Sequence, residues 1–218
     1  NLFVDAGAKD LATAAARIAY GARLASYRFD QYRTKESADS KPTLRTLTVR
    51  VKGAANARRA FQSLDKVADG VFMTRDLVSQ PPNVLFPKSF ANEAKTLTKL
   101  GVKVEVLGEK QMAKLGMETL LAVGRGSEQE SQLAVMRWNG GGRSVKPVAF
   151  VGKGVTFDTG GISLKPGAGM EEMKWDMGGA GAVTGLMKAL AGRKAKVNAV
   201  GVIGLVENMP DGRAQRPG

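Results

Sequence analysis

The chain has 218 residues, and its 33 lysines and arginines outnumber its 20 aspartates and glutamates, which gives a formal net charge of +13. Hydrophobic residues make up 43% of the sequence, so it can bury a sizeable core and does not have the composition of a disordered chain. It contains no cysteine and no histidine, which excludes disulfides, thiol catalysis and a Ser-His-Asp triad within these residues. Any metal site must therefore use oxygen ligands or something unusual.

The excess of positive charge has two explanations. Basic chains often bind nucleic acid, but the lysines and arginines are scattered and no aromatic residues interleave with them. Alternatively, the balancing acidic residues lie outside this sequence, which starts at Asn1 and ends in Arg216-Pro217-Gly218, a segment that reads as mid-chain turn material. We therefore expect a fragment of a longer protein. No membrane span is expected, because no run of about 18 apolar residues occurs.

The first 80 residues predict a mostly helical unit. In chain order, the patterns predict a helix over residues 9–25, a polar loop over 30–41, a strand over 44–51 and a long helix over 54–78. Gly70 is expected to weaken the long helix, and the pair Pro81-Pro82 is expected to end it.

A second unit follows, in which strands alternate with helices. The patterns predict helices over 89–100, 110–114 and 179–190, strands over 102–106, 133–138, 148–151 and 197–206, and an apolar stretch over 120–123. Ser89 is expected to cap the first of these helices and Gly101 to end it, and the glycine-rich segment 140–143 is typical of turns that join neighbouring strands. The sequence therefore predicts an α/β fold with a mixed β-sheet flanked by helices.

One glycine-rich apolar segment, residues 151–180, contains the candidates for chemistry. Its sequence is VGKGVTFDTGGISLKPGAGMEEMKWDMGGA, and the candidates are Lys153, Asp158, Lys165 and Asp176. Charged side chains in apolar surroundings need partners, and two aspartates could share a divalent cation that offsets their mutual repulsion. Carboxylates followed by glycines at strand ends also lie where α/β sheets usually bind ligands.

Each candidate also has an ordinary interpretation. Asp176 precedes a predicted helix and could complement its macrodipole, Asp158 could be a turn aspartate, and either lysine could be a surface residue. A phosphate-binding loop at Lys153 is a weak alternative, because Pro147 stands where a glycine is required and Gly154 where a serine or threonine is required. The case for a metal site thus rests on the combination of residues.

Two motifs make the segment specific. VGKGVTFDTGGISLKP, followed by EEMKWDMGGA, resembles the metal-binding stretch of the leucyl aminopeptidase family, also called the cytosol aminopeptidase family or peptidase family M17. LVSQPPNVLFPKSFA and VIGLVENMPDGRAQRPG extend the resemblance. It implies that residues 1–53 are the C-terminal part of a smaller α/β N-terminal domain, that 54–75 form an interdomain helix, and that 76–218 are the N-terminal portion of the metallopeptidase catalytic domain.

The resemblance also implies a role for each candidate. Lys153 matches a lysine whose uncharged amine binds one metal, and Asp176 matches a further ligand of the same metal. Asp158 matches the carboxylate that bridges two metals. Lys165 matches a catalytic lysine that stabilises the oxyanion of the tetrahedral intermediate. Met173 matches a residue that lines the pocket for the substrate's first side chain, although ordinary core packing is an alternative for it.

The function implied by the resemblance is the release of N-terminal amino acids from peptides by two-metal-assisted hydrolysis. The implied cofactors are two divalent ions per active site, zinc or manganese, with bicarbonate in the complete enzyme, and the implied assembly is a cytoplasmic homohexamer. The family completes its site with an N-T-D-A-E-G-R motif, which does not occur in these 218 residues. We therefore expect half of the metal site here, and little or no peptidase activity from these residues alone.

Two other functions stay open. Some bacterial members of the family also bind DNA, so a DNA-binding regulatory role could exist in addition to or instead of peptidase activity. An α/β module that has lost catalysis is a further hypothesis. Substituting Asp158 with alanine in the full-length protein separates an enzyme from such a module.

Overall fold

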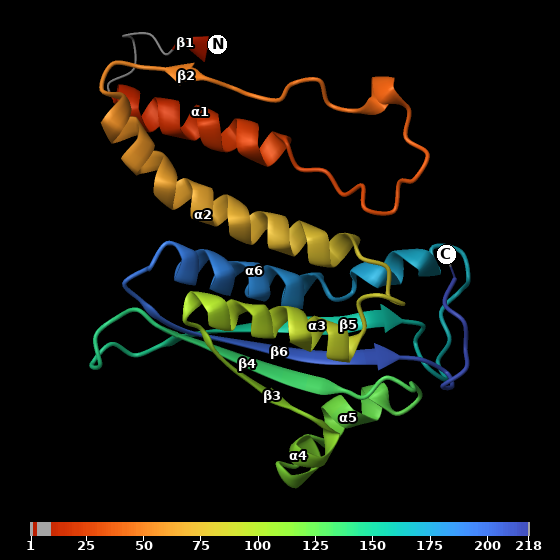
Figure 1. Ribbon diagram of the computed structural model, residues 1–218. Coiled ribbons are helices and arrows are strands. Elements are labelled where there is room, and N and C mark those ends of the chain that lie inside the picture. Colours follow the sequence, from red (N-terminus) through yellow and green to blue (C-terminus); the bar gives the residue numbers. More distant parts are fainter. Residues whose placement is uncertain (1, 4–9, 218) are drawn as a thin grey trace.

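Figure 1 shows the computed structural model of the chain, which describes residues 2–3 and 10–217. The α-helices are α1 (Leu11–Ala25), α2 (Ala54–Ser79), α3 (Pro87–Lys95), α4 (Glu109–Lys114), α5 (Glu118–Gly124) and α6 (Gly178–Gly192). The strands are β1 (Leu2–Phe3), β2 (Val49–Arg50), β3 (Lys103–Leu107), β4 (Gln132–Asn139), β5 (Val148–Asp158) and β6 (Asn198–Asn208). Three short 3₁₀ helices are η1 (Ala38–Ser40), η2 (Thr96–Leu100) and η3 (Met170–Trp175).

The second half of the chain forms a four-stranded mixed sheet in the order β3-β4-β6-β5. β4 is antiparallel to β3 and β6, whereas β5 and β6 are parallel. Helices α3 and α6 cover one face of the sheet (Figure 1), and the main core between them contains Phe90, Met187 and Ile203. The predicted α/β fold with a mixed sheet flanked by helices is confirmed.

The glycine-rich segment 140–143 connects two strands that are not neighbours. It leads from β4 to β5, but β6 lies between these strands. The connection crosses the start of β6, where Gly141 N donates to Asn198 Oδ1 at 2.9 Å and Asn198 Nδ2 donates to Val145 O at 2.7 Å. The prediction of a turn between neighbouring strands is therefore wrong, because the strand that separates them comes later in the sequence.

Strand β5 continues beyond its predicted end and includes the first half of the motif segment. Its parallel pairing with β6 extends to Asp158. Gly152 allows α6 to approach closely, since a Cβ added there would lie 2.7 Å from Ala180 Cα. The sequence predicts a shorter strand, over 148–151, because Gly152 and Gly154 interrupt the apolar pattern, whereas β5 continues through both glycines. As a consequence, Lys153 and Asp158 belong to one strand.

Helix α2 runs unbroken through Gly70, so the predicted weak point is instead a close packing contact. A Cβ added at Gly70 would lie 2.4 Å from Gly185 O, and one added at Gly185 would lie 2.4 Å from Gly70 O. The two helices thus approach through their backbones. Thr74 Oγ1 adds a hydrogen bond from α2 to Gly181 O of α6 at 3.1 Å.

Two boundaries differ from the sequence-based expectation. The predicted helix 89–100 divides into α3, which begins at Pro87, and η2, which ends at Gly101 with φ of 87° as expected. Ser89 lies inside the first turn of α3, where its Oγ accepts a hydrogen bond from Phe86 N at 2.9 Å. Ser89 is therefore not the N-cap residue of α3. It is the N3 residue, and its side chain accepts from the backbone N–H of the N-cap residue, as in a capping box.

The first unit contains less strand than expected. Only Val49–Arg50 of the predicted strand 44–51 is extended and paired, because its described partner β1 is a two-residue parallel strand. Helix α1 agrees with the predicted helix from Leu11 on, and Lys9 lies outside the described residues. Within the part of the chain that the structure describes, no helix is long and apolar enough to cross a membrane.

Candidate metal centre

The pairing of β5 with β6 has a β-bulge between Lys153 and Asp158. Val155 pairs with Val206 and Asp158 with Asn208, so β5 contains one more residue than β6 over this stretch. Side chains alternate along a strand, and residues five positions apart would otherwise point to opposite faces. The extra residue reverses that alternation and re-aims Asp158.

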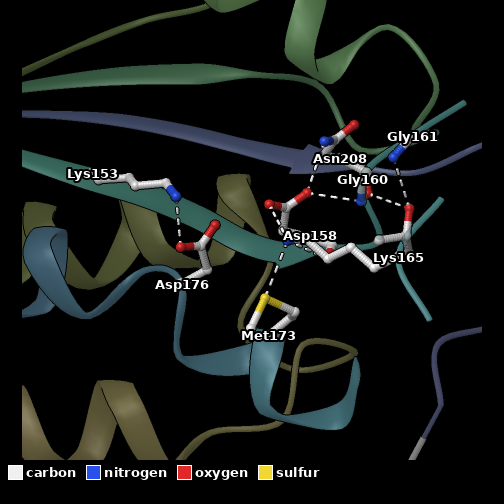
Figure 2. Close-up of polar contacts among 9 residues, drawn as sticks. Lys153, Asp158, Gly160, Gly161, Lys165, Met173, Asp176 and Asn208 are labelled. Carbon is white, nitrogen blue, oxygen red and sulfur yellow. Dashed lines mark hydrogen bonds and ion pairs between the residues drawn. The ribbon is translucent and has the colours of Figure 1, made fainter. Parts of the chain in front are cut away.

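The first half of the candidate centre is the pair formed by Lys153 and Asp176. Lys153 comes from β5 and Asp176 from the end of η3, just before α6. Lys153 Nζ donates to Asp176 Oδ1 at 2.6 Å (Figure 2), and the two side chains are 63% and 19% exposed. Asp176 therefore faces β5 and forms an ion pair there, in addition to standing just before helix α6.

The second half is the Asp158 carboxylate, which has a donor on each oxygen. Lys165 Nζ donates to Oδ2 at 2.5 Å. Gly160 N and Asn208 Nδ2 donate to Oδ1 at 2.9 Å and 2.7 Å. Burial alone would raise the pKa of this carboxyl, but the hydrogen bonds from Lys165 and the two neutral N–H donors hold the pKa below its ordinary value. Asp158 is therefore ionised at neutral pH.

Met173 lies on η3 beside the second half of the centre. Its Sδ accepts a contact from Lys165 Nζ at 3.2 Å, as Figure 2 shows. Its side chain also packs against a small buried cluster that contains Phe157 and Met209. The alternative of ordinary core packing thus accounts for part of its surface, while the sulfur faces the charged residues.

One buried oxygen tests whether these residues suit a cation. Asp176 Oδ2 is buried and has no hydrogen-bond partner among the residues that the structure describes. Leaving a buried carboxylate oxygen unpaired costs on the order of 1–3 kcal/mol or more, so such an atom in a native protein calls for an explanation, and a bound ion is one. In the view of Figure 2 this carboxylate lies between Lys153 and Asp158. Two carboxylates and an amine fit a divalent cation such as zinc or manganese.

The described part of the chain holds few candidate metal donors. Over residues 2–3 and 10–217, no three histidine, cysteine, aspartate or glutamate side chains come together as a metal site. Asp158 and Asp176 supply two carboxylates, and Lys153 supplies the third donor. The expectation of half a metal site stays a prediction.

Comparison with known proteins decides the family. A sequence profile described as the catalytic domain of the cytosol aminopeptidase family matches residues 72–218. The chain belongs to the cytosol aminopeptidase family. It is 60% identical over 208 residues to a "Probable cytosol aminopeptidase" of Caulobacter vibrioides and 57% identical over 220 residues to one of Agrobacterium fabrum. These alignments cover 95% and 100% of this chain but 42% and 44% of those proteins.

Two solved structures with related sequences have the same fold. The bottromycin maturation enzyme BotP in complex with Mn superposes with a TM-score of 0.81 at 34% identity, covering 97% of this chain and 44% of that one. A cytosol aminopeptidase from Coxiella burnetii gives a TM-score of 0.72 at 29% identity, covering 94% of this chain and 42% of that one. The chain thus spans less than half the length of the relatives and solved structures named here.

Sequence reasoning missed one polar residue of the centre. Asn208 donates to Asp158 although the two are 50 positions apart. It stands in the ENM part of VIGLVENMPDGRAQRPG, a segment used only to extend the resemblance. The available signal was its place at the end of a buried strand, where a polar side chain follows an apolar run.

Proposed function

We propose that the full-length protein containing these residues is a metal-dependent aminopeptidase that releases N-terminal amino acids from peptides. The observation that carries the proposal is the unpaired buried Oδ2 of Asp176, in a cluster of ion pairs within a chain that belongs to the cytosol aminopeptidase family. Lys153, Asp158 and Asp176 would hold divalent ions, with Lys153 acting as a neutral amine. Two such ions, zinc or manganese, would supply an activated water and polarise the scissile carbonyl.

The residues of this chain divide the remaining work. Lys165 lies against Asp158 Oδ2 and would turn its ammonium group to the oxyanion that develops during attack, where a positioned charge stabilises the transition state. Met173 would contact the first side chain of the substrate from the neighbouring helix η3. Capture of the free N-terminal amine at the metal centre would restrict cleavage to the first peptide bond.

Further parts of the proposal rest on the family resemblance. We propose the domain division at residues 53 and 75, a cytoplasmic homohexamer, and bicarbonate as an aid to catalysis in the complete enzyme. The relatives named above are called cytosol aminopeptidases, which supports the location. A DNA-binding role stays a prediction that depends on the net charge of +13. Duplex binding that weakens steeply with salt would support it.

The test uses the full-length protein with leucine p-nitroanilide and its N-acetylated form. We expect hydrolysis of the free amine only, loss of activity after chelation, and recovery on adding Mn²⁺ or Zn²⁺. Asp158→Ala should abolish activity, whereas Asp211→Ala, at an exposed loop aspartate whose carboxylate accepts from Arg213 N, should not. Unchanged activity of Asp158→Ala would end the enzymatic proposal, and cleavage of the N-acetylated substrate would exclude an aminopeptidase.

A further inference from the structure

The two oxygens of Asp158 are held by different kinds of donor. Oδ2 faces the Lys165 ammonium group, which carries a full positive charge. Oδ1 receives two neutral N–H groups, Asn208 Nδ2 at 2.7 Å and Gly160 N at 2.9 Å (Figure 2). Neutral donors stabilise the ionised carboxylate without adding a charge that would repel a dication. Oδ1 is thus fixed from the side of β6.

Asn208 is itself fixed by the residue that follows Asp158. Its carbonyl oxygen accepts from Thr159 N at 3.0 Å and from Thr159 Oγ1 at 2.8 Å, and Thr159 is buried. Gly161 lies close to the Asn208 amide, since a Cβ added there would lie 2.7 Å from Asn208 Oδ1. The backbone of Asn208 is thus hydrogen-bonded to Thr159, while its side chain is hydrogen-bonded to Asp158. The end of β6 and the end of β5 therefore fix each other.

We propose that Asn208 is a positioning residue that orients the Asp158 carboxylate for the metal centre. This inference rests on the proposed function. The terminal torsion of an aspartate is broad, so the carboxylate plane needs external donors to select one orientation. Hydrogen-bond partners of metal ligands typically change metal affinity or activity by about 10–100-fold when they are removed. Because Gly160 N still holds Oδ1, we expect the lower end of that range, about 10-fold.

Asn198 provides a matched control on the same strand. It stands at the opposite end of β6, about 33 Å away for a strand of this length. Its amide also makes hydrogen bonds, accepting from Gly141 N and donating to Gly142 O and Val145 O, but these hold a connecting loop. Asn198→Ala therefore removes an equivalent structural amide without touching Asp158.

The experiment titrates the full-length protein with Mn²⁺ and measures free Mn²⁺ by electron paramagnetic resonance. The variants are Asn208→Ala, Asn208→Leu, which keeps the side-chain size but removes the donor, and Asn198→Ala. We expect Mn²⁺ affinity to fall about 10-fold in both Asn208 variants and to stay at the wild-type value in Asn198→Ala. Thermal unfolding of all three is measured in parallel, and the affinity loss should persist in whichever Asn208 variant unfolds at the same temperature as Asn198→Ala.

Kinetics at limiting and saturating Mn²⁺ add a second measurement. The activity lost by Asn208→Ala should be partly restored by raising Mn²⁺, whereas a general structural defect would not respond to the metal. Equal Mn²⁺ affinity in Asn208→Leu, Asn198→Ala and the wild type would overturn the positioning role while leaving the proposed function intact. A wild-type protein that neither binds Mn²⁺ nor hydrolyses leucine p-nitroanilide would instead reject the proposed function itself.

Discussion

Two clusters of paired charges in the molecule differ in how completely their partners satisfy them. The helix cluster joins α1 to α2 and consists of Arg23, Asp65, Lys66 and Asp69. Arg23 bonds both aspartates, and Lys66 Nζ lies 3.0 Å from Asp69 Oδ2. Lys66 Nζ also lies 3.7 Å from Asp65 Oδ2, so each carboxylate oxygen in the helix cluster has a cationic partner, and the cluster connects two helices.

The strand cluster consists of Lys153, Asp158, Lys165 and Asp176, and it is assembled differently. It has the same number of positive and negative groups, yet Asp176 Oδ2 stays unpaired among the described residues. Strand β5, which contributes Lys153 and Asp158 to the cluster, contains a bulge, and glycines stand near both residues in the sequence. Ion pairing alone therefore does not separate a structural cluster from a site. We propose that the unpaired buried oxygen and the bulge together indicate a site in the strand cluster.

Removing one carboxylate from each cluster should give the sharpest contrast. Asp176→Asn in the full-length protein should lower kcat/KM about 1,000-fold or more, because losing a metal ligand removes several kcal/mol of transition-state stabilisation. Asp69→Asn should leave kcat/KM within about twofold, since surface ion pairs contribute little. Metal content measured by mass spectrometry should fall only in Asp176→Asn. Equal activities of the two variants would remove the distinction between the clusters.

The lysines of the two clusters should differ in the same direction. Lys165→Ala should lower kcat about 100-fold with a smaller change in KM, because a group that acts mainly on the oxyanion stabilises the transition state more than the bound substrate. Lys66→Ala is the matched control and should leave both constants unchanged. Steady-state kinetics at saturating metal checks this prediction, and a rise in KM alone would assign Lys165 to substrate binding instead.

Local patterns predicted five of the six described α-helices and most strands, because periodicity is a property of neighbouring residues. Helix α5 was expected only as an apolar stretch over 120–123. The helix over 179–190 and the strand over 133–138 agree with α6 and β4. The order of the strands and the bulge before Asp158 depend on β6, which is distant in sequence. Pairing between distant segments leaves no local signal, so the role of segment 140–143 was misjudged.

The candidate site likewise has a part that the local sequence predicts and a part that depends on pairing between distant strands. Lys153, Asp158, Lys165, Met173 and Asp176 lie within one motif segment, and the structure brings them into two adjacent pairs with Met173 beside Lys165. Asn208 was not predicted, because its contact with Asp158 joins two strands that the sequence alone could not pair. The unpaired Oδ2 of Asp176 could not be predicted from the sequence either, since the burial of one atom depends on the whole fold.

The helix scaffold offers a further contrast between two glycines. Gly70→Ala should destabilise the protein by about 1–3 kcal/mol, because the new Cβ would lie 2.4 Å from Gly185 O and force α2 from α6. Gly21→Ala, in α1, meets no atom within 4 Å and should stabilise by about 0.5–1 kcal/mol through higher helix propensity. Denaturant unfolding of both variants checks the signs. Two losses of similar size would show that packing between α2 and α6 does not set the cost.

The smallest expected effect is a pH dependence that belongs to the helix cluster. Burial alone would raise the pKa of the Asp69 carboxyl, but hydrogen bonds from Arg23 and Lys66 hold that pKa below its ordinary value. A carboxyl with a lowered folded-state pKa stabilises the protein fully above its unfolded pKa of about 3.9, and that stability is lost as pH falls through the folded pKa. The free energy of unfolding of the wild type should therefore exceed that of Asp69→Asn by at most about 1 kcal/mol near pH 6. The gap should narrow as pH falls below the unfolded pKa towards the lower folded pKa. A gap that stays constant between pH 6 and pH 3 in thermal unfolding would mean that Asp69 acts through packing and not through its charge.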